Sequence, residues 1–166
     1  MCIRDRINIP GFSVNNILLP GAPNSKTFTI PVTGFSDINI SNVGVHLNIS
    51  HTRVSDLVAT VKAPDGNMVT LFVSPGANAG PCTGDNVLVD IFDDAANSAA
   101  DLLNMCNLVA PAISGEFRPT SPLSIFDNIN ADGNWEITIH DISNGEGGVI
   151  NAVSYTHLTL PTSDLV

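Results

Sequence analysis

Val43-Gly44-Val45-His46-Leu47-Asn48-Ile49 alternates apolar residues with polar or small ones, and this stretch decides the fold class. A period of two places the apolar side chains on one face of an extended chain, so residues 38–49 are predicted to form a half-buried strand. The same pattern recurs in shorter stretches that are separated by turn-forming residues. Short alternating strands with frequent turns predict an all-β fold, a single-domain β-sandwich of the jelly-roll type.

Six further stretches carry strand signals. Asp65-Gly66 lies between two apolar runs, and Gly accepts the positive φ of a tight turn, so residues 64–67 predict a hairpin. Only residues 93–106, which are rich in Ala and Leu, tolerate a helix, and they predict one short helix or an irregular loop. The further strands are expected at 27–32, 57–61, 68–73, 87–92, 135–139 and from 149 onward.

Composition limits the classes of function. The 166 residues suit one domain with its own core, and a hydrophobic fraction of 43% excludes a disordered chain. No apolar run approaches the roughly 18 to 20 residues of a membrane span. Lys and Arg total 6 against 16 Asp and Glu, and the formal net charge of −10 argues against a nucleic-acid partner. An acidic chain with 13 Gly and 11 Pro is typical of a secreted or cell-surface protein.

The two ends of the sequence differ from the middle. Met1 to Arg6 and Val153 to Thr162 resemble translations of a transposon-type sequencing adapter, read inward from each end of a DNA fragment. An ordinary signal remnant and an ordinary last strand are the alternative. Residues 1–6 lack the apolar segment of a signal peptide, so the adapter interpretation is favoured.

These ends set the predicted organisation of the chain. Pro161 blocks continued pairing in a central strand, so the chain is expected to leave the sandwich near Tyr155, with Leu158 and Leu160 exposed. The expected divisions are a non-native end at 1–6, a linker or first strand region at 7–26, the domain at 27–152 and a non-native tail at 153–166.

Two cysteines, Cys82 and Cys106, remain when Cys2 is set aside with the non-native end. An even number in a chain of extracellular character predicts a disulfide, which would tie down the loop between them. Two reduced cysteines are the alternative. A zinc site that combined them with His46 and His51 would lack the close ligand spacing of such sites.

Calcium is the cofactor that the sequence suggests, and none is required. Residues 128–133 imitate the start of an EF-hand loop, but Ile139 stands where the bidentate carboxylate is needed, so a tight polar turn is favoured. Close carboxylates elsewhere either repel one another or hold a hard cation through oxygen ligands. The expected calcium ligands are Asp90, Asp93 and Asp94, with Asp56 and Asp141 as candidate partners across loops.

His51 and Asp56 raise the question of hydrolytic chemistry. Nucleophilic catalysis also needs an activated Ser and an oxyanion hole, and the sequence contains no Gly-x-Ser-x-Gly pattern. Gly-rich phosphate loops are absent too. We therefore expect His51 to hold the end of a strand by hydrogen bonding, and Asp56 to cap backbone amides.

Five segments form an ordered set of motifs. They are His51-Thr52-Arg53-Val54-Ser55-Asp56-Leu57, Val61-Lys62-Ala63-Pro64-Asp65-Gly66 followed by Val69-Thr70-Leu71, Phe92-Asp93-Asp94-Ala95-Ala96, Gly115-Glu116-Phe117-Arg118-Pro119 with Leu123 and Phe126, and Gly133-Asn134-Trp135 with Asp141, Gly145 and Gly148. Together they resemble the P domain, or Homo B domain, of kexin- and furin-like subtilisin proteases (the proprotein convertases) and related bacterial secreted proteases. The resemblance covers about residues 38–152.

The resemblance implies a jelly-roll sandwich that follows a subtilisin-like serine endopeptidase domain in one secreted parent chain. In that family the P domain is non-catalytic, packs on the protease and supports its folding and stability, so this fragment is expected not to be an enzyme. His51, Asp56, Trp135 and Asp141 are then structural motif residues, with Trp135 in the core. The sequence departs from the family because no subtilisin motif is present and residues 153–155 replace a usual Trp-containing continuation.

Two other origins for the module stay open. The parent could be a secreted metalloprotease or an adhesin that carries the same domain. Alternatively, the chain is a stand-alone protein- or glycan-binding module of a secreted or cell-surface protein. A glycan-binding module predicts an exposed aromatic platform, and the alternation of Trp135 with core positions disfavours it.

Overall fold

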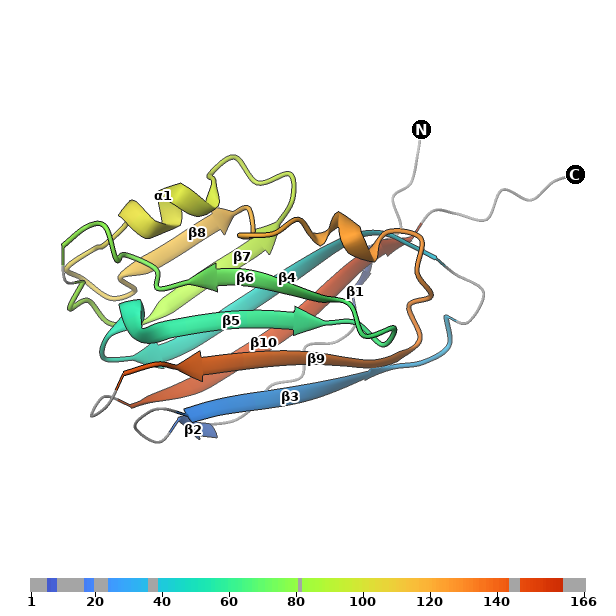
Figure 1. Ribbon diagram of the computed structural model, residues 1–166, viewed down its shortest axis with the longest axis horizontal. Coiled ribbons are helices and arrows are strands. Elements are labelled where there is room, and N and C mark those ends of the chain that lie inside the picture. The colour runs from blue at the N-terminus through green and yellow to red at the C-terminus, as the bar shows by residue number, and fades with distance from the viewer. Residues whose placement is uncertain are drawn as a thin grey trace, which may run out of the picture.

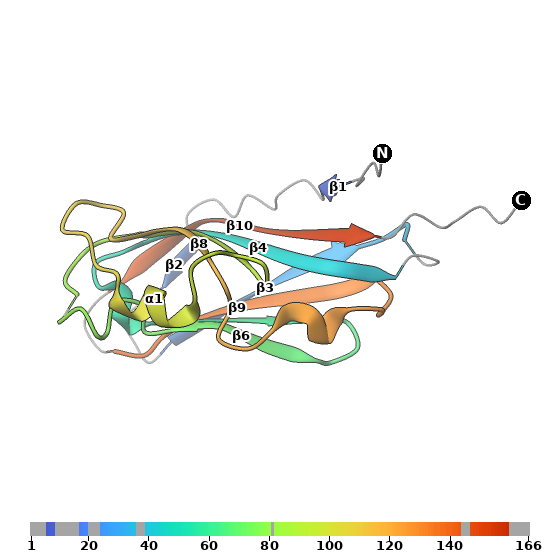
Figure 2. The ribbon, with the colours of Figure 1, turned by 90° about the horizontal axis from the view of Figure 1, so that it is seen from above.

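Two β-sheets pack face to face in the computed structural model, which describes residues 6–8, 17–19, 24–35, 39–80, 82–143 and 147–159. The four-stranded sheet lies in front of the larger sheet in Figure 1, and Figure 2 shows the layers from the edge. The larger sheet has the order β1-β10-β4-β7-β8, with β2 also pairing with β10, and the smaller has the order β3-β9-β5-β6. The all-β prediction is confirmed, whereas the jelly-roll connectivity stays an interpretation.

Ten strands are found within the described residues. The larger sheet contains β1 (Arg6–Asn8), β2 (Ile17–Leu19), β4 (Ile40–His51), β7 (Val87–Phe92), β8 (Ile113–Phe117) and β10 (Gly148–Thr159). The smaller sheet contains β3 (Asn24–Val32), β5 (Leu57–Lys62), β6 (Met68–Val73) and β9 (Gly133–Asp141). The connections contain the helix α1 (Ala99–Asn104) and two 3₁₀ turns, η1 (Val54–Asp56) and η2 (Leu123–Phe126).

β4 is central in the larger sheet, and its alternation explains its position. Val43, Val45, Leu47 and Ile49 are buried, while the side chains between them are half-buried. β10 pairs with one edge of β4 and β7 with the other, both antiparallel. This arrangement fixes the register, because a slip of one residue would turn every apolar side chain to the wrong face.

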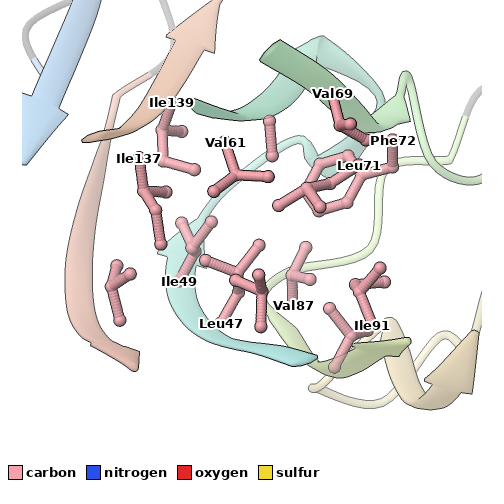
Figure 3. Close-up of a cluster of buried hydrophobic side chains, with 14 of the residues drawn as sticks. Leu47, Ile49, Val61, Val69, Leu71, Phe72, Val87, Ile91, Ile137 and Ile139 are labelled. Atoms are coloured by element: carbon pink, nitrogen blue, oxygen red, sulfur yellow. The ribbon is translucent and has the colours of Figure 1, made fainter. Parts of the chain in front are cut away.

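The core lies between the sheets and is filled from both of them (Figure 3). Burial of this apolar surface is the main favourable term for a fold of this size. Leu47, Ile49, Val87 and Ile91 from the larger sheet face Val61, Val69, Leu71, Phe72, Ile137 and Ile139 from the smaller sheet.

The hairpin between β5 and β6 is confirmed. Gly66 adopts a φ of 95°, the left-handed conformation that the turn requires of it. The Ala63 N–H donates to the Asn67 carbonyl at 2.8 Å, and the Asp65 carboxylate accepts from the Asn67 N–H at 2.9 Å. The turn therefore closes through its own polar residues.

The region 93–106 contains one short helix, α1, as one of the two predicted alternatives. Ser98 begins it with a capping box: its hydroxyl accepts from the Asp101 N–H at 3.2 Å, and the Asp101 carboxylate accepts from the Ser98 N–H at 2.6 Å.

The strand that follows α1, β8, is absent from the sequence prediction. It lies parallel to β7 at the sheet edge, and its Ser114-Gly115-Glu116 centre breaks the apolar alternation.

The expectation that the chain leaves the sandwich near Tyr155 is wrong. The backbone of β10 pairs with β4 as far as Thr159, opposite Ile40, and β1 pairs with residues 156–158 of β10. Strand hydrogen bonds are made by any backbone that can extend, so the composition of the tail does not prevent pairing. The side chain of Leu158 and all of Leu160 lie outside the described residues, and the proposed domain divisions stay a prediction.

Candidate functional site

Three charged or titratable side chains are buried at one end of the sandwich. His51 ends β4, Asp56 ends η1 and Asp141 ends β9, and the three residues are 2%, 7% and 1% exposed. Among the described residues, these three make up the full set of buried polar or charged side chains. Burial of such groups is costly unless they are paired, so their contacts decide what this cluster can do.

His51 and Asp141 form a fully enclosed pair. The Nε2 atom of His51 lies 3.2 Å from Oδ2 of Asp141, and neither side chain is exposed. The other ring nitrogen, Nδ1, lies 3.1 Å from the Arg53 amide nitrogen and 2.9 Å from the Arg53 carbonyl oxygen. A neutral ring with its proton on Nε2 donates to Asp141 and accepts from the Arg53 N–H. A protonated ring donates to both Asp141 and the Arg53 carbonyl.

Both ring nitrogens are therefore occupied in either protonation state. A general base needs a free nitrogen within reach of a substrate proton, and His51 offers none to solvent. His51 instead holds the end of β4 to the turn that follows it, which is the role that the sequence analysis favoured. The second oxygen of Asp141 accepts from the Ser143 N–H at 3.2 Å and so fixes the next turn as well.

Asp56 differs from its expected role. Its Oδ1 atom faces the Arg53 guanidinium, with Nε at 3.6 Å, and its buried Oδ2 atom has no hydrogen-bond partner. The expectation that this carboxylate caps backbone amides is therefore wrong. Its backbone carbonyl, not its side chain, ties the turn to β9 by accepting from the Ile142 N–H at 2.9 Å.

Sequence reasoning missed two residues that support His51. Asn86 accepts the His51 N–H on its side-chain oxygen at 3.1 Å and donates its own N–H to the His51 carbonyl at 3.0 Å. Its φ of 71° is a conformation that Asn tolerates better than most residues. Gly148 lies opposite His51 in the sheet, where an added Cβ would come within 2.5 Å of the Ser50 carbonyl oxygen and 2.6 Å of His51 Cδ2.

A disulfide joins the loops beside this cluster. Cys82 and Cys106 are bonded, with their Cα atoms 5.8 Å apart and a sequence separation of 24. The adjoining backbone is tied on both sides, because Gly76 N–H donates to the Leu102 carbonyl at 3.0 Å and Asn78 N–H to the Leu103 carbonyl at 2.9 Å. The bridge thus fixes the long connection that follows β6 to the end of α1.

The three expected calcium ligands have separate roles. Asp90 faces solvent on β7 and lies 2.8 Å from Nδ1 of His46. Asp93 uses both carboxylate oxygens, each at 2.8 Å, to accept the N–H groups of Leu123 and Ser124 at the start of η2. Asp94 is exposed. Within the described ranges, no group of three or more His, Cys, Asp or Glu side chains is arranged to hold a metal ion.

Two other carboxyl groups have shifted pKa values. Burial, and secondarily the charge of Asp93, raise the pKa of Asp127 above its ordinary range. Hydrogen bonds from the Ser98 backbone and then its side chain lower the pKa of Asp101, with a smaller contribution from Arg118. Asp101 lies in the first turn of α1 and Asp127 directly follows η2, so these shifts reflect local structure.

Trp135 lies in the core and is not part of a surface site. It is fully buried, donates its indole N–H to the Ala131 carbonyl at 3.0 Å and meets Phe126 edge to face at 5.2 Å between ring centroids. In the polar turn before it, Asn130 accepts the Asp132 N–H at 2.7 Å, and Asp132 ties the turn to the end of β3 by accepting the Phe35 N–H at 2.7 Å. Residues 128–133 therefore act as the tight turn that the sequence favoured.

Comparison with known proteins identifies solved structures that share this fold. No protein-family model matches the chain, and no curated protein matches it. The crystal structure of a serine protease of Aeromonas sobria superposes with a TM-score of 0.53 and 18% identity, over 93% of this chain and 26% of that chain. A crystal structure of the Aeromonas sobria serine protease in complex with the chaperone ORF2 gives a TM-score of 0.50 at 18% identity, over the same shares. The chain thus spans about a quarter of the solved chains that it matches.

Proposed function

We propose that this chain is the non-catalytic accessory domain of a secreted subtilisin-like serine endopeptidase, a P domain that stabilises its catalytic domain and assists its folding. The observation that carries the proposal is the shared fold: almost the whole chain matches a quarter of a much longer serine protease chain. The five ordered motifs from His51 to Gly148 support the same relationship.

The proposed domain acts by contact and not by chemistry. His51, the candidate base of this chain, is enclosed with both nitrogens occupied. A folded domain that binds the native catalytic domain but not its unfolded form raises the stability of the native form. Covalent linkage strengthens such a contact, because it converts association into an intramolecular step. Calcium is an optional ligand in this proposal and no step depends on it.

The stand-alone glycan-binding alternative receives no support from the described surface. Trp135 is enclosed, and Phe28, Phe72, Phe117 and Phe126 are buried as well. A stacking platform needs exposed aromatic faces; among the aromatic side chains that the structure describes, Phe35 and Phe92 are half-buried and none is exposed. A protein partner is therefore the better match to this sandwich.

The upstream coding sequence tests the proposal first. A subtilisin-type domain immediately before this region is the expected result, and an adhesin or metalloprotease domain would contradict it. The second test expresses the parent protease with and without residues 24–159. We expect the shortened protein to yield less active enzyme and to lose activity faster on heating, while the separate chain hydrolyses no peptide or ester.

A further inference from the structure

Leu108 and Val109 are the most exposed large apolar side chains in the described part of the chain, at 92% and 80%. The other large apolar side chains on this surface reach at most 62%, at Met68. Figure 2 shows their connection, between α1 and β8, looping out at the end where β10 begins. We call these two residues the apolar tip. Adjacent aliphatic side chains left in water lose the favourable free energy of burial, and nothing in the described fold covers them.

The base of this loop is fixed although its tip is bare. Asn107 N–H donates to the Ala112 carbonyl at 2.9 Å, and Ala112 N–H donates to the Asp85 carbonyl at 2.7 Å. Cys106 anchors the incoming chain through its disulfide. Gly84 packs so closely that an added Cβ would lie 2.6 Å from both the Ala112 Cβ and the Asn107 carbonyl oxygen. A tip presented from a fixed base needs little further ordering when it binds, which favours a specific contact.

The segments that carry the tip are uncharged, while Asp85, whose carbonyl accepts from the Ala112 N–H, is exposed at its base. No Asp, Glu, Lys or Arg occurs in residues 102–115, which carry the tip, or in residues 66–84, which the disulfide joins to them. The whole chain nevertheless has a net charge of −10. A pocket that takes up the tip alone therefore removes no charged group of these segments from water and leaves the Asp85 carboxylate outside. The tip is suited to an apolar pocket on another folded surface.

We propose that the apolar tip inserts into an apolar pocket on the catalytic domain of the same parent chain, an inference that rests on the proposed function above. Two aliphatic side chains bury too little surface to offset the freedom that separate molecules lose on association. A covalently tethered domain has already lost most of that freedom, so a small contact is sufficient. Charge repulsion opposes the other occupants, because a second copy carries the same net charge and cellular bilayer surfaces are anionic.

The test uses the full parent protease with Leu108→Ser and Val109→Ser together. We expect the half-life of proteolytic activity at elevated temperature to fall by about tenfold, since burial of two aliphatic side chains is lost. The matched control, Met68→Ser with Val73→Ser, removes two exposed apolar side chains from β6 and should change the half-life less than about twofold. A third variant, Leu108→Ile with Val109→Ile, keeps the tip apolar and should preserve most of the half-life.

The possible results separate this proposal from the proposed function. If removal of residues 24–159 leaves the half-life unchanged, the proposed function fails and the tip contact fails with it. If that removal shortens the half-life but the Ser variant does not, the tip contact alone is refuted. Equal effects of the Ser variant and the β6 control would also refute it. Two further results would refute the tip contact if the Ser variant keeps its half-life. Loss of self-association in light scattering would identify a second copy as the occupant. Loss of sedimentation with anionic phosphatidylserine vesicles would identify a membrane surface.

Discussion

Two neighbouring regions at one end of the sandwich reverse the usual distribution of polar and apolar side chains. His51 and Asp141 are ionisable and fully enclosed, whereas Leu108 and Val109 are aliphatic and almost fully exposed. The backbone of Asp85 and Asn86 connects the regions, since Asn86 bonds to His51 and Asp85 bonds to Ala112.

The difference lies in where the compensating partners are found. Both nitrogens of the enclosed His51 imidazole have a partner within the fold, so contacts inside the domain account for the burial of this ionisable side chain. The apolar tip has no such partner among the described residues. A buried polar side chain whose partners lie within the fold has a structural role. Large apolar side chains that the fold leaves in water indicate a binding surface.

Asp141→Ala should break the enclosed pair and give the largest effect. It leaves the buried imidazole without its carboxylate and frees the Ser143 N–H, so we expect a loss of about 3–5 kcal/mol in the free energy of unfolding. Urea unfolding measures this loss. Asp90→Ala is the control, because Asp90 pairs with the partly exposed His46 and should cost at most about 1 kcal/mol. Equal losses in both variants would contradict the structural role of the enclosed pair.

The disulfide supports the base of the tip, and its removal is expected to cost somewhat less. Replacement of Cys82 and Cys106 by Ala removes a cross-link between positions that are 24 apart in sequence, which frees the unfolded chain and should lower stability by about 2–4 kcal/mol. Thermal melting of the wild-type chain with and without reductant provides the matched comparison. A variant that melts at the wild-type temperature would show that hydrogen bonds alone fix this end of the molecule.

Gly148→Ala tests the enclosed pair from the neighbouring strand. The added methyl would meet the Ser50 carbonyl oxygen and the His51 ring, so β10 must shift away from β4. We expect a loss of about 1–3 kcal/mol, as for other overpacked sites. Chemical shifts of the His51 ring in nuclear magnetic resonance should change as well. Unchanged stability and an unchanged His51 signal would mean that this approach is less close than the structure indicates.

Asp127→Asn extends the comparison to a carboxyl group that is partly buried beside another acid. Burial and the charge of Asp93 raise its pKa, so the folded state holds the proton more tightly than the unfolded state. Its contribution to stability is therefore lost as the pH rises through the raised pKa. The variant should be more stable than wild type at pH 7, by at most about 1 kcal/mol, and equal to it below about pH 3. Urea midpoints at several pH values measure this, and a gain that persists at pH 3 would contradict the assignment.

Leu108→Ser with Val109→Ser should have the smallest effect on the 166-residue chain itself. These side chains are exposed, so their replacement should change the free energy of unfolding by less than about 0.5 kcal/mol. A loss of several kcal/mol in urea unfolding would show that the tip packs within its own fold. The contrast between this small effect and the large one expected in the parent protease is what separates a binding surface from a core.

The sequence predicted features that depend on local pattern. Alternation located β4 and β9, and the even cysteine count identified the Cys82–Cys106 bridge. The hairpin at Gly66 followed from turn chemistry. β8 was missed because a short edge strand parallel to β7 contains Gly115 and lacks alternation.

The parts that could not be predicted depend on contacts between distant segments. Asn86 and Gly148 carry no local signal for a role beside His51, because they meet it only through strand pairing. The same holds for the Asp56 carboxylate, whose surroundings are set by the turn at Arg53. The exposure of Leu108 also could not be predicted, because an aliphatic residue in a connecting loop can equally be buried in the core or exposed on a binding surface.

Hydrogen exchange in the intact parent protease tests the central claim most directly. The amides of Leu108 and Val109 donate no hydrogen bond within the described structure, so an uncovered tip should exchange at the rate of an unstructured peptide. We predict that both amides exchange at least about tenfold more slowly than that in the parent protein, because the catalytic domain covers them. Exchange at the unstructured rate would contradict the account and leave the apolar tip without a partner in its own chain.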